Sequence, residues 1–167
     1  IAVWIKSEVK TANTWNFILT YRYGPTQPFD SYKIATNPIY NNSWTFGIGD
    51  ESSGNQVELI NKFPKQDNVW MHVATVFDGA TMKIYTNGIL DTTLITSIPN
   101  IAYSSGVLAI GNSLTNAVHS FMGAMDDLRI YNRALSSTEI RALAGLSSQT
   151  LYYSKSTGSI NQLSTWG

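Results

Sequence analysis

The stretch that decides the fold reads FMGAMDDLRIYNRALSSTEI, residues 121–140. It predicts a strand followed by a short helix. Strand alternation places Asp126 on the same face as the apolar Leu128, which we expect to be the core side. Asp127 and Arg129 then share the opposite face and can pair with each other there. Because a lone carboxylate is costly to bury, Asp126 needs hydrogen-bond donors, a cation or a metal nearby.

The helix that follows is specified by local signals. Ser136 is a good N-cap, and Glu139 three residues later completes a capping box. Leu135 before the cap and Ile140 after it have the spacing of a hydrophobic staple. These signals predict a helix over 137–144, which has little more than two turns. A helix this short is unstable alone and must dock on the rest of the fold.

Composition excludes several classes of protein. The chain has 167 residues, of which 13% are charged, and its formal net charge is zero. Nucleic acids and anionic membranes bind basic patches, so neither is an expected partner. Cysteine is absent, which rules out disulfides and thiol chemistry. No apolar run approaches the roughly 18 residues that span a bilayer.

Short segments with strand periodicity, separated by turns, fill most of the chain. The clearest apolar strand is 69–77, and the next strand ends in Asn87-Gly88, a strong signal for a tight hairpin. About eleven such segments with frequent turns predict an all-β sandwich or barrel. Four tryptophans lie in strand-like segments, and we expect them in the core: Trp4, Trp15, Trp44 and Trp70.

Segments 69–79, 82–88 and 108–112, together with the stretch at 121–140, resemble the laminin-G-like, concanavalin A-like jelly roll. The resemblance implies an all-β, two-sheet antiparallel jelly-roll sandwich with one short helix near the C-terminus. Domains of this family are mostly non-catalytic modules of large extracellular proteins, and they bind glycans or other proteins.

The resemblance also suggests a domain division. We expect a jelly-roll domain over 1–146, with the family's first strand missing because it usually precedes the strand at Ile1. Residues 147–167 are expected to form a final strand and a linker, or the start of a further module. Neighbouring domains of a larger chain are therefore expected partners.

Asp126 is the candidate metal ligand. Many relatives hold calcium with the carboxylate at this motif position, so the resemblance implies a possible structural Ca²⁺ here. Calcium takes six to eight oxygens, and one carboxylate cannot supply them. The alternative is a buried Asp126 that accepts backbone N–H groups or pairs with an arginine.

Catalysis is not expected. Glucanases of this fold place two carboxylates alternately on one strand, about 5 Å apart, and the chain has no such run. His72 and His119 lack metal-ligand spacing. Alternation places His72 on the face of Ala74 and Val76, which predicts a structural histidine, whereas His119 is expected at the surface or an edge.

Glycan binding requires exposed aromatic rings and planar polar groups. Tyr23, Tyr32 and Tyr40 fall at strand ends or in loops, and Arg22 adds a planar donor, so these four are the candidate ligand-binding residues. The alternative is that the tyrosines close the ends of the core with their hydroxyl groups in water.

The sequence therefore predicts a non-catalytic binding module of a secreted or cell-surface protein, with carbohydrate as the expected ligand. A structural spacer or protein–protein adhesion domain is the first alternative, and a glycoside hydrolase is the second.

Overall fold

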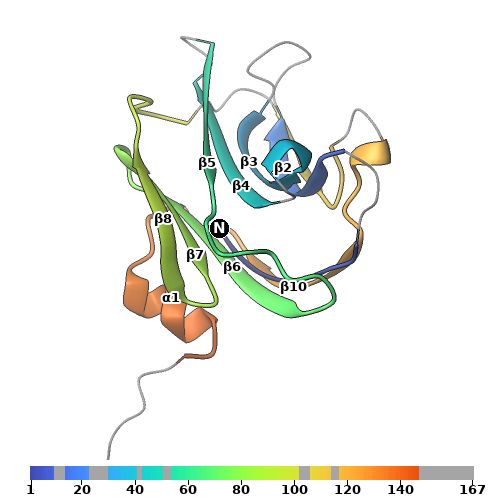
Figure 1. Ribbon diagram of the computed structural model, residues 1–167. Helices are drawn as coiled ribbons and strands as arrows, with labels where there is room; N and C mark the ends of the chain where they lie inside the picture. Colours follow the sequence, from blue (N-terminus) through green and yellow to red (C-terminus); the bar gives the residue numbers. More distant parts are fainter. Residues whose placement is uncertain are drawn as a thin grey trace, which may run out of the picture.

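A computed structural model describes residues 1–9, 14–22, 30–40, 43–50, 54–101, 106–113 and 117–146. Two five-stranded antiparallel sheets stack on each other, and one short helix lies outside them (Figure 1). The predicted two-sheet sandwich with a single α-helix is thus confirmed for this part of the chain. No helix among these residues is long and apolar enough to cross a membrane.

The two sheets differ in their sequence of strands. Sheet A has the order β10-β1-β6-β7-β8 and consists of β1 (Ala2–Ser7), β6 (Trp70–Phe77), β7 (Thr81–Thr86), β8 (Ile89–Ile95) and β10 (Gly123–Arg129). Sheet B has the order β5-β4-β3-β2-β9 and consists of β2 (Asn16–Arg22), β3 (Asp30–Asn37), β4 (Ser43–Asp50), β5 (Asn55–Ile60) and β9 (Val107–Ile110). Two 3₁₀ turns, η1 (Pro38–Tyr40) and η2 (Ala117–His119), and helix α1 (Ser137–Leu143) complete the described elements.

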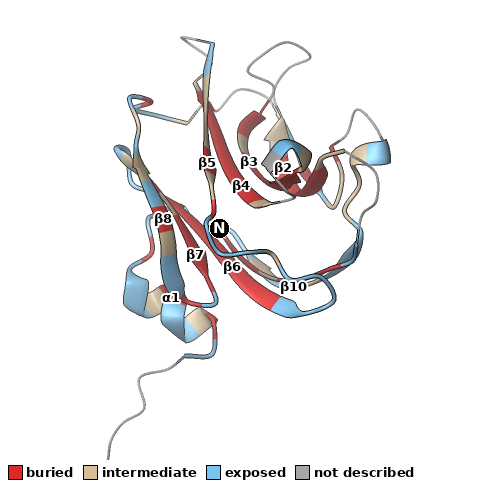
Figure 2. Ribbon diagram, in the orientation of Figure 1, coloured by how far each residue is buried: buried red, intermediate tan, exposed pale blue. Residues whose placement is uncertain are grey.

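The core lies between the sheets and is built from alternate residues of their strands. Figure 2 shows β3, β4 and β6 buried along most of their length. Two clusters form this core: Val3, Ile5, Ile18, Leu19, Ile34, Trp44 and Val73 in one, and Phe46, Ile48, Leu59, Met82, Ile84 and Ile98 in the other. Each large aliphatic side chain that is fully buried stabilises the fold by about 1.5–3 kcal/mol.

Helix α1 covers the outer face of sheet A. Ile140 of the helix and Leu135 before it are buried with Ala74 and Val76 of β6 in a third apolar cluster. The predicted capping box is present, and the helix begins at Ser137 as expected. The predicted staple pair therefore also anchors the helix to the sheet.

The expectation for the tryptophans is only partly correct. Trp44 is 1% exposed and belongs to the core between the sheets. Trp70 is 43% exposed, because it is the first residue of β6 and lies at the end of sheet A. Trp4 and Trp15 are half-buried.

Candidate functional site

One row of residues crosses the whole outer face of sheet B. In register from β9 to β5 it consists of Ala109, Thr20, Lys33, Gly47 and Glu58. The adjacent row, which includes Ile34, Phe46 and Leu59, belongs to the core, so this row faces away from it. Whereas α1 covers the outer face of sheet A, it does not reach this face of the sandwich.

Lys33 lies flat across this face. A Cβ atom on Gly47 would come within 2.8 Å of Lys33 Cε, so a larger residue at this position would displace the lysine stem from its place over the sheet. The ammonium group thereby crosses β4 and reaches β5, where Lys33 Nζ lies 2.6 Å from Glu58 Oε1. The small residue at position 47 thus places a charged group over the middle of the sheet.

A second carboxylate reaches the same ammonium group. Asp30 Oδ2 lies 3.7 Å from Lys33 Nζ, and Asp30 Oδ1 accepts a 2.6 Å hydrogen bond from the Thr20 hydroxyl. The Lys33 and Asp30 side chains are 6% and 4% exposed, whereas Glu58 is 27% exposed. Buried charges are tolerated when they are paired in this way. In this network the Lys33 and Asp30 side chains are therefore buried, and the Glu58 carboxylate is partly exposed to solvent.

An aromatic ring completes the group. The centre of the Trp15 ring lies 4.4 Å from Lys33 Nζ, within the range of a cation–π interaction. The Phe17 ring is 5.9 Å from that of Trp15. Trp15 is half-buried. We call Trp15, Asp30, Lys33 and Glu58 the Lys33 site. It combines a half-buried indole ring with a fixed set of charged hydrogen-bonding groups.

The Lys33 site does not have the layout of a glycosidase. Glycoside hydrolysis uses two carboxyl groups that flank the sugar, with space for the substrate between them. Here the lysine ammonium lies between Asp30 and Glu58 and pairs with both. In the described residues no group of three or more histidine, aspartate and glutamate side chains could hold a metal ion.

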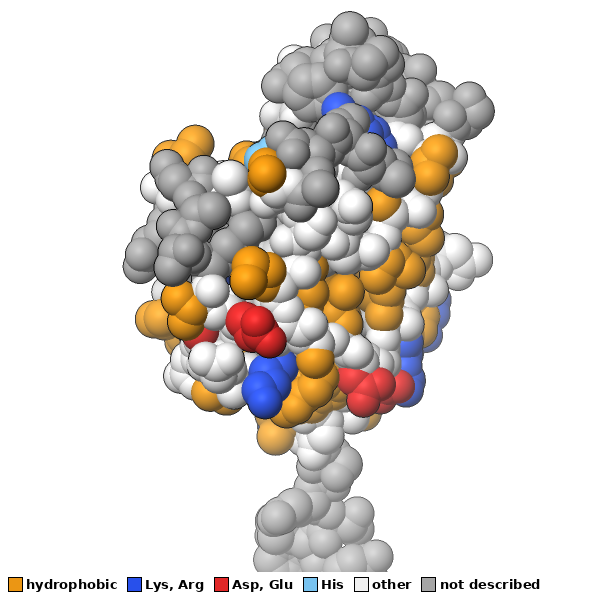
Figure 3. All heavy atoms as spheres, turned by 90° about the vertical axis from the view of Figure 1, so that its right-hand side faces the viewer, with side chains coloured by type: hydrophobic (Ala, Val, Ile, Leu, Met, Phe, Trp, Pro, Cys, Tyr) orange, Lys and Arg blue, Asp and Glu red, His pale blue; other side chains and the backbone are white. Residues whose placement is uncertain are grey.

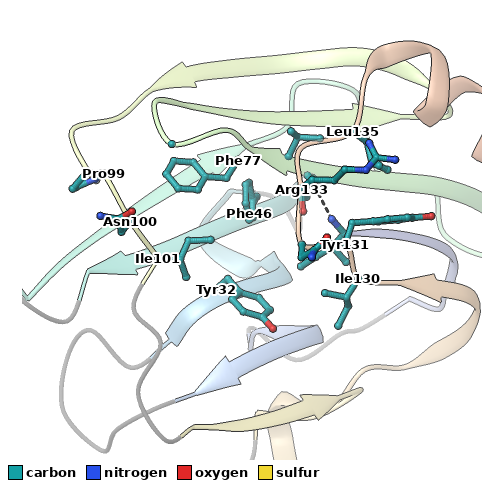
Figure 4. Close-up of a pocket in the computed structure, with 15 residues that line it drawn as sticks. Tyr32, Phe46, Phe77, Pro99, Asn100, Ile101, Ile130, Tyr131, Arg133 and Leu135 are labelled. Atoms are coloured by element: carbon teal, nitrogen blue, oxygen red, sulfur yellow. Dashed lines mark hydrogen bonds between the residues drawn. The ribbon is translucent and has the colours of Figure 1, made fainter.

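A cavity of about 790 Å³ opens at the end of the sandwich, in the position drawn in Figure 4. Tyr32, Phe46 and Phe77 line it from both sheets, and segment 130–133 lines it between β10 and α1. Thr75 also lines it. The Thr75 hydroxyl is buried and has no hydrogen-bond partner in the part of the chain that the structure describes. We call this space the end cavity.

The predicted orientation of Asp126 is wrong. The three residues of β1 from Ala2 to Trp4 lie opposite four residues of β10, from Asp126 to Arg129. This bulge places Asp127 at a φ of 50°, and the alternation of side chains changes phase there. Asp126 is consequently exposed and does not face the core.

The inward-facing residues of β10 are Met125 and Leu128 instead. Asp126 Oδ1 accepts the backbone N–H of Asp127 at 2.8 Å, and the predicted pair of Asp127 with Arg129 is present at 3.3 Å. The described residues do not gather a set of carboxylates around Asp126 that would fit calcium. Calcium binding stays a prediction. A rise in melting temperature with calcium that Asp126→Asn removes would support it.

Of the four candidate glycan residues, the structure describes the side chains of Arg22 and Tyr32. Tyr32 lines the end cavity, and its ring stacks on Tyr21 with centroids 5.4 Å apart. Arg22 ends β2 and is half-buried. Tyr23 lies outside the described residues, as does the side chain of Tyr40. Sequence reasoning missed the Lys33 site, although a lysine within the alternating pattern of 31–37 was a signal for a charged group on the sheet.

His72 is buried on the outer face of sheet A, as predicted. Its ring meets the Trp4 ring edge-on, with centroids 5.4 Å apart. Its Nδ1 atom has no hydrogen-bond partner among the described residues. Burial and, to a smaller extent, the Arg129 guanidinium lower the pKa of His72 to about 4, and the Asp127 carboxylate opposes the shift. His72 is therefore a neutral packing residue at neutral pH.

Residues 1–141 match the family model described as "Concanavalin A-like lectin/glucanases superfamily". The chain belongs to this superfamily. The superfamily is named for both lectins and glucanases. Membership therefore establishes the fold but does not assign an activity.

Several solved structures have folds similar to that of this concanavalin A-like chain. The binding domain of Paraclostridial Mosquitocidal Protein 1 is 17% identical, with a TM-score of 0.65, and the match covers 86% of this chain and 36% of that one. This chain thus spans about a third of the toxin binding domain. At this identity the likeness establishes the fold alone.

Two similar structures contain a sugar. The Ruminococcus gnavus IT-sialidase CBM40, bound to α2,3 sialyllactose, is 17% identical, has a TM-score of 0.65, and covers 86% of this chain and 80% of its own. Domain 4 of AbnA, a GH43 extracellular arabinanase from Geobacillus stearothermophilus, was solved with arabinotriose. It is 21% identical, with a TM-score of 0.64, over 86% of this chain and 64% of that chain.

Proposed function

We propose that the chain is a non-catalytic, glycan-binding module of a larger secreted or cell-surface protein, and that the Lys33 site binds the sugar. The observation that carries the proposal is the half-buried Trp15 ring, fixed beside an ion network whose outermost carboxylate, Glu58, reaches the surface. The solved structures with sialyllactose and arabinotriose support a sugar as the ligand of this fold.

The chemistry of the site suits a neutral sugar. The apolar face of a pyranose or furanose ring packs on an indole, and sugar hydroxyl groups donate to a carboxylate such as that of Glu58. Because Lys33 is held by Glu58 and Asp30, these groups are already oriented before a ligand arrives. Preorganisation of this kind lowers the entropic cost of binding.

Affinity electrophoresis on a panel of soluble polysaccharides tests the proposal. We expect retardation by at least one polymer, and we expect Trp15→Ala and Glu58→Gln to abolish it. Trp70→Ala is the matched control, because Trp70 is also exposed to solvent but lies at the end of sheet A. Absence of retardation on every polymer, or equal retardation of all variants, would reject glycan binding at the Lys33 site.

A second function, protein–protein adhesion, is favoured by one observation. Figure 3 shows hydrophobic side chains gathered on the side of the molecule where β10 lies in Figure 1. Large exposed apolar residues lie in β9, in η2, between η2 and β10, and directly after β10, namely Val107, Leu108, Ile110, Val118, Met122 and Ile130. Both β9 and β10 end the strand order of their sheets. Apolar surface of this kind is typical of protein interfaces.

A further inference from the structure

Large apolar side chains are exposed at one end of the sandwich, around the turn between β7 and β8. Figure 1 shows this turn at the lower end of the molecule, together with the start of β6 and the end of α1. Six residues there are between 39% and 52% exposed, namely Phe63, Val69, Trp70, Ile89, Leu90 and Leu146. We call them the turn-end patch.

Backbone bonds and packing bring this patch together from distant parts of the chain. The Asn87 side chain accepts the His72 N–H at 2.8 Å, which places the turn beside the start of β6, where Trp70 lies. A Cβ atom on Gly88 would lie 3.1 Å from Leu146 Cδ1, so the chain after α1 packs on the turn. The patch is therefore one surface made by a turn, a strand end and the end of a helix.

Basic side chains border the turn-end patch. Lys6 lies directly opposite Trp70 in the register of β1 and β6, so the two side chains are neighbours on one face. The Arg141 Cα atom of α1 lies 3.3 Å from the position that a Cβ on Gly88 would take. In the part of the chain that the structure describes, Lys6, Lys62 and Arg141 form no ion pair.

The carboxylates among these residues are already engaged. Asp91 accepts the backbone N–H of Lys62 at 2.7 Å and that of Phe63 at 3.3 Å, which holds the loop before β6 against β8. Asp67 pairs with Lys65. The free charges that border the patch are thus basic, although the net charge of the whole chain is zero.

We propose that the turn-end patch inserts into the surface of a lipid bilayer that contains anionic lipids. Exposed apolar residues with a polar rim mark interaction surfaces, and tryptophan is enriched where proteins meet the membrane interface. Interfacial binding grows with the apolar area that is buried and with attraction of basic residues to anionic headgroups. This binding is independent of the Lys33 site, which lies on the other sheet.

The charges at the rim favour a bilayer over a second copy of the chain. In a two-fold symmetric dimer the same surface of each subunit meets its twin. Contact through the turn-end patch would therefore bring Lys62 and Arg141 of both copies to one interface, where like charges repel. An anionic bilayer instead supplies apolar chains for the patch and phosphate groups for its basic rim. The expectation that no membrane is a partner rested on net charge, whereas folding gathers these cations at one end.

Cosedimentation of the full chain with vesicles tests the proposal. The probe is a vesicle of phosphatidylcholine with about 30 mol% phosphatidylserine, and pure phosphatidylcholine vesicles are the comparison. We expect saturable binding to the first and at least about tenfold weaker binding to the second. Raising the salt from about 0.1 M to about 0.5 M should also weaken binding, because charges at the headgroups are screened. Absence of binding to the anionic vesicles would overturn the proposal.

Quenching by lipids that carry bromine on their acyl chains separates insertion from adsorption. We expect these lipids to quench the fluorescence of the bound chain, because Trp70 reaches the acyl region. Trp70→Phe should lose most of this quenching and still bind, since phenylalanine keeps an apolar ring at the same position. Binding without quenching would show that charge alone holds the chain at the headgroups, and it would overturn insertion.

Substitutions on β8 locate the contact. The double variant Ile89→Ser, Leu90→Ser should weaken vesicle binding at least about tenfold, because it removes two apolar side chains of the patch. Ile95→Ser is the matched control, since Ile95 is 83% exposed at the other end of the same strand. Phe63→Ser replaces the double variant if that variant fails to fold.

Three results would contradict a bilayer as the occupant. The first is unchanged vesicle binding by a folded patch variant, and the second is an equal loss in Ile95→Ser. The third is self-association of the chain in sedimentation velocity that the patch variant removes while vesicle binding persists, because this would assign the patch to a second copy.

Discussion

Lys33 and Glu58 come together across an intervening strand, with Lys33 Nζ 2.6 Å from Glu58 Oε1 although β4 separates β3 from β5. The contact is possible because Gly47 of β4, which pairs with both residues, has no side chain. A glycine in one strand thus determines the position of a charge that belongs to another. The same arrangement holds the ammonium group beneath Trp15.

Lys33→Met should lower the free energy of unfolding by about 3 kcal/mol, because the buried Asp30 carboxylate would lose its cationic partner. Urea unfolding followed by fluorescence measures this change. Lys83→Met is the control. Lys83 pairs with Asp78 at 3.2 Å near the surface, where an ion pair contributes about 0–1 kcal/mol. Equal losses of unfolding free energy in the two variants would show that the Lys33 ion pairs contribute no more to stability than a surface ion pair does.

Gly123→Ala should destabilise the fold by roughly 4 kcal/mol or more, because the new Cβ would lie 2.1 Å from the Lys6 carbonyl oxygen. This glycine has a φ of 139°, and its neighbour is backbone that cannot rotate away. Gly54→Ala is the matched control. Gly54 has a φ of 68° with no atom within 4 Å, so only the left-handed backbone penalty of about 1–2 kcal/mol applies. Thermal unfolding of both variants distinguishes the two cases.

Stability should fall as the pH is lowered from about 6.5 to about 4, because His72 stays neutral in the folded protein over this range. Burial depresses its folded pKa to about 4, whereas the unfolded chain takes up the proton near the ordinary value of 6.5. The unfolded state therefore binds more protons within this window, and His72 contributes a loss on the order of 2–3 kcal/mol. Urea unfolding across this range measures the slope. His72→Phe should reduce the slope, and an unchanged slope in the variant would assign it to other groups.

Ser136→Ala should cost about 1 kcal/mol, because the Ser136 hydroxyl accepts the backbone N–H of Glu139 and caps α1. The Glu139 carboxylate pairs with Arg133 and accepts the backbone N–H of Ser136, and these contacts lower its pKa to about 2. Ser137→Ala is the control, since Ser137 is the first helical residue and lies after the cap. A thermal shift in the control as large as that in Ser136→Ala would show that the cap has no special role.

Features that depend on neighbouring residues in the sequence could be predicted. The capping box and the staple of α1 are present, and the Asn87-Gly88 turn has positive φ at both positions, 50° and 76°. Each of these features depends on residues only a few positions apart, so it can be predicted from the sequence alone. The pairing of Asp127 with Arg129 was predicted for the same reason.

The orientation of Asp126 could not be predicted in this way. Its exposure depends on a bulge that forms only where β10 pairs with β1, two segments separated by more than a hundred residues. Alternation assumes an unbroken ladder, and one extra residue reverses the faces of every residue beyond it. The Lys33 site was missed for a related reason, because Trp15 and Glu58 approach Lys33 only after strands β2, β3, β4 and β5 have paired.

The sequence by itself determined the all-β class and the capped helix, since local periodicity, turn residues and caps specify these. The superfamily and its two-sheet sandwich were inferred from the resemblance of the sequence motifs. The tertiary structure decided which charges meet and which face each strand presents. It alone placed Lys33 over Gly47, exposed Asp126 and opened a cavity beside Phe77. Strand register and sheet packing set these relationships, and they join residues that no local pattern connects.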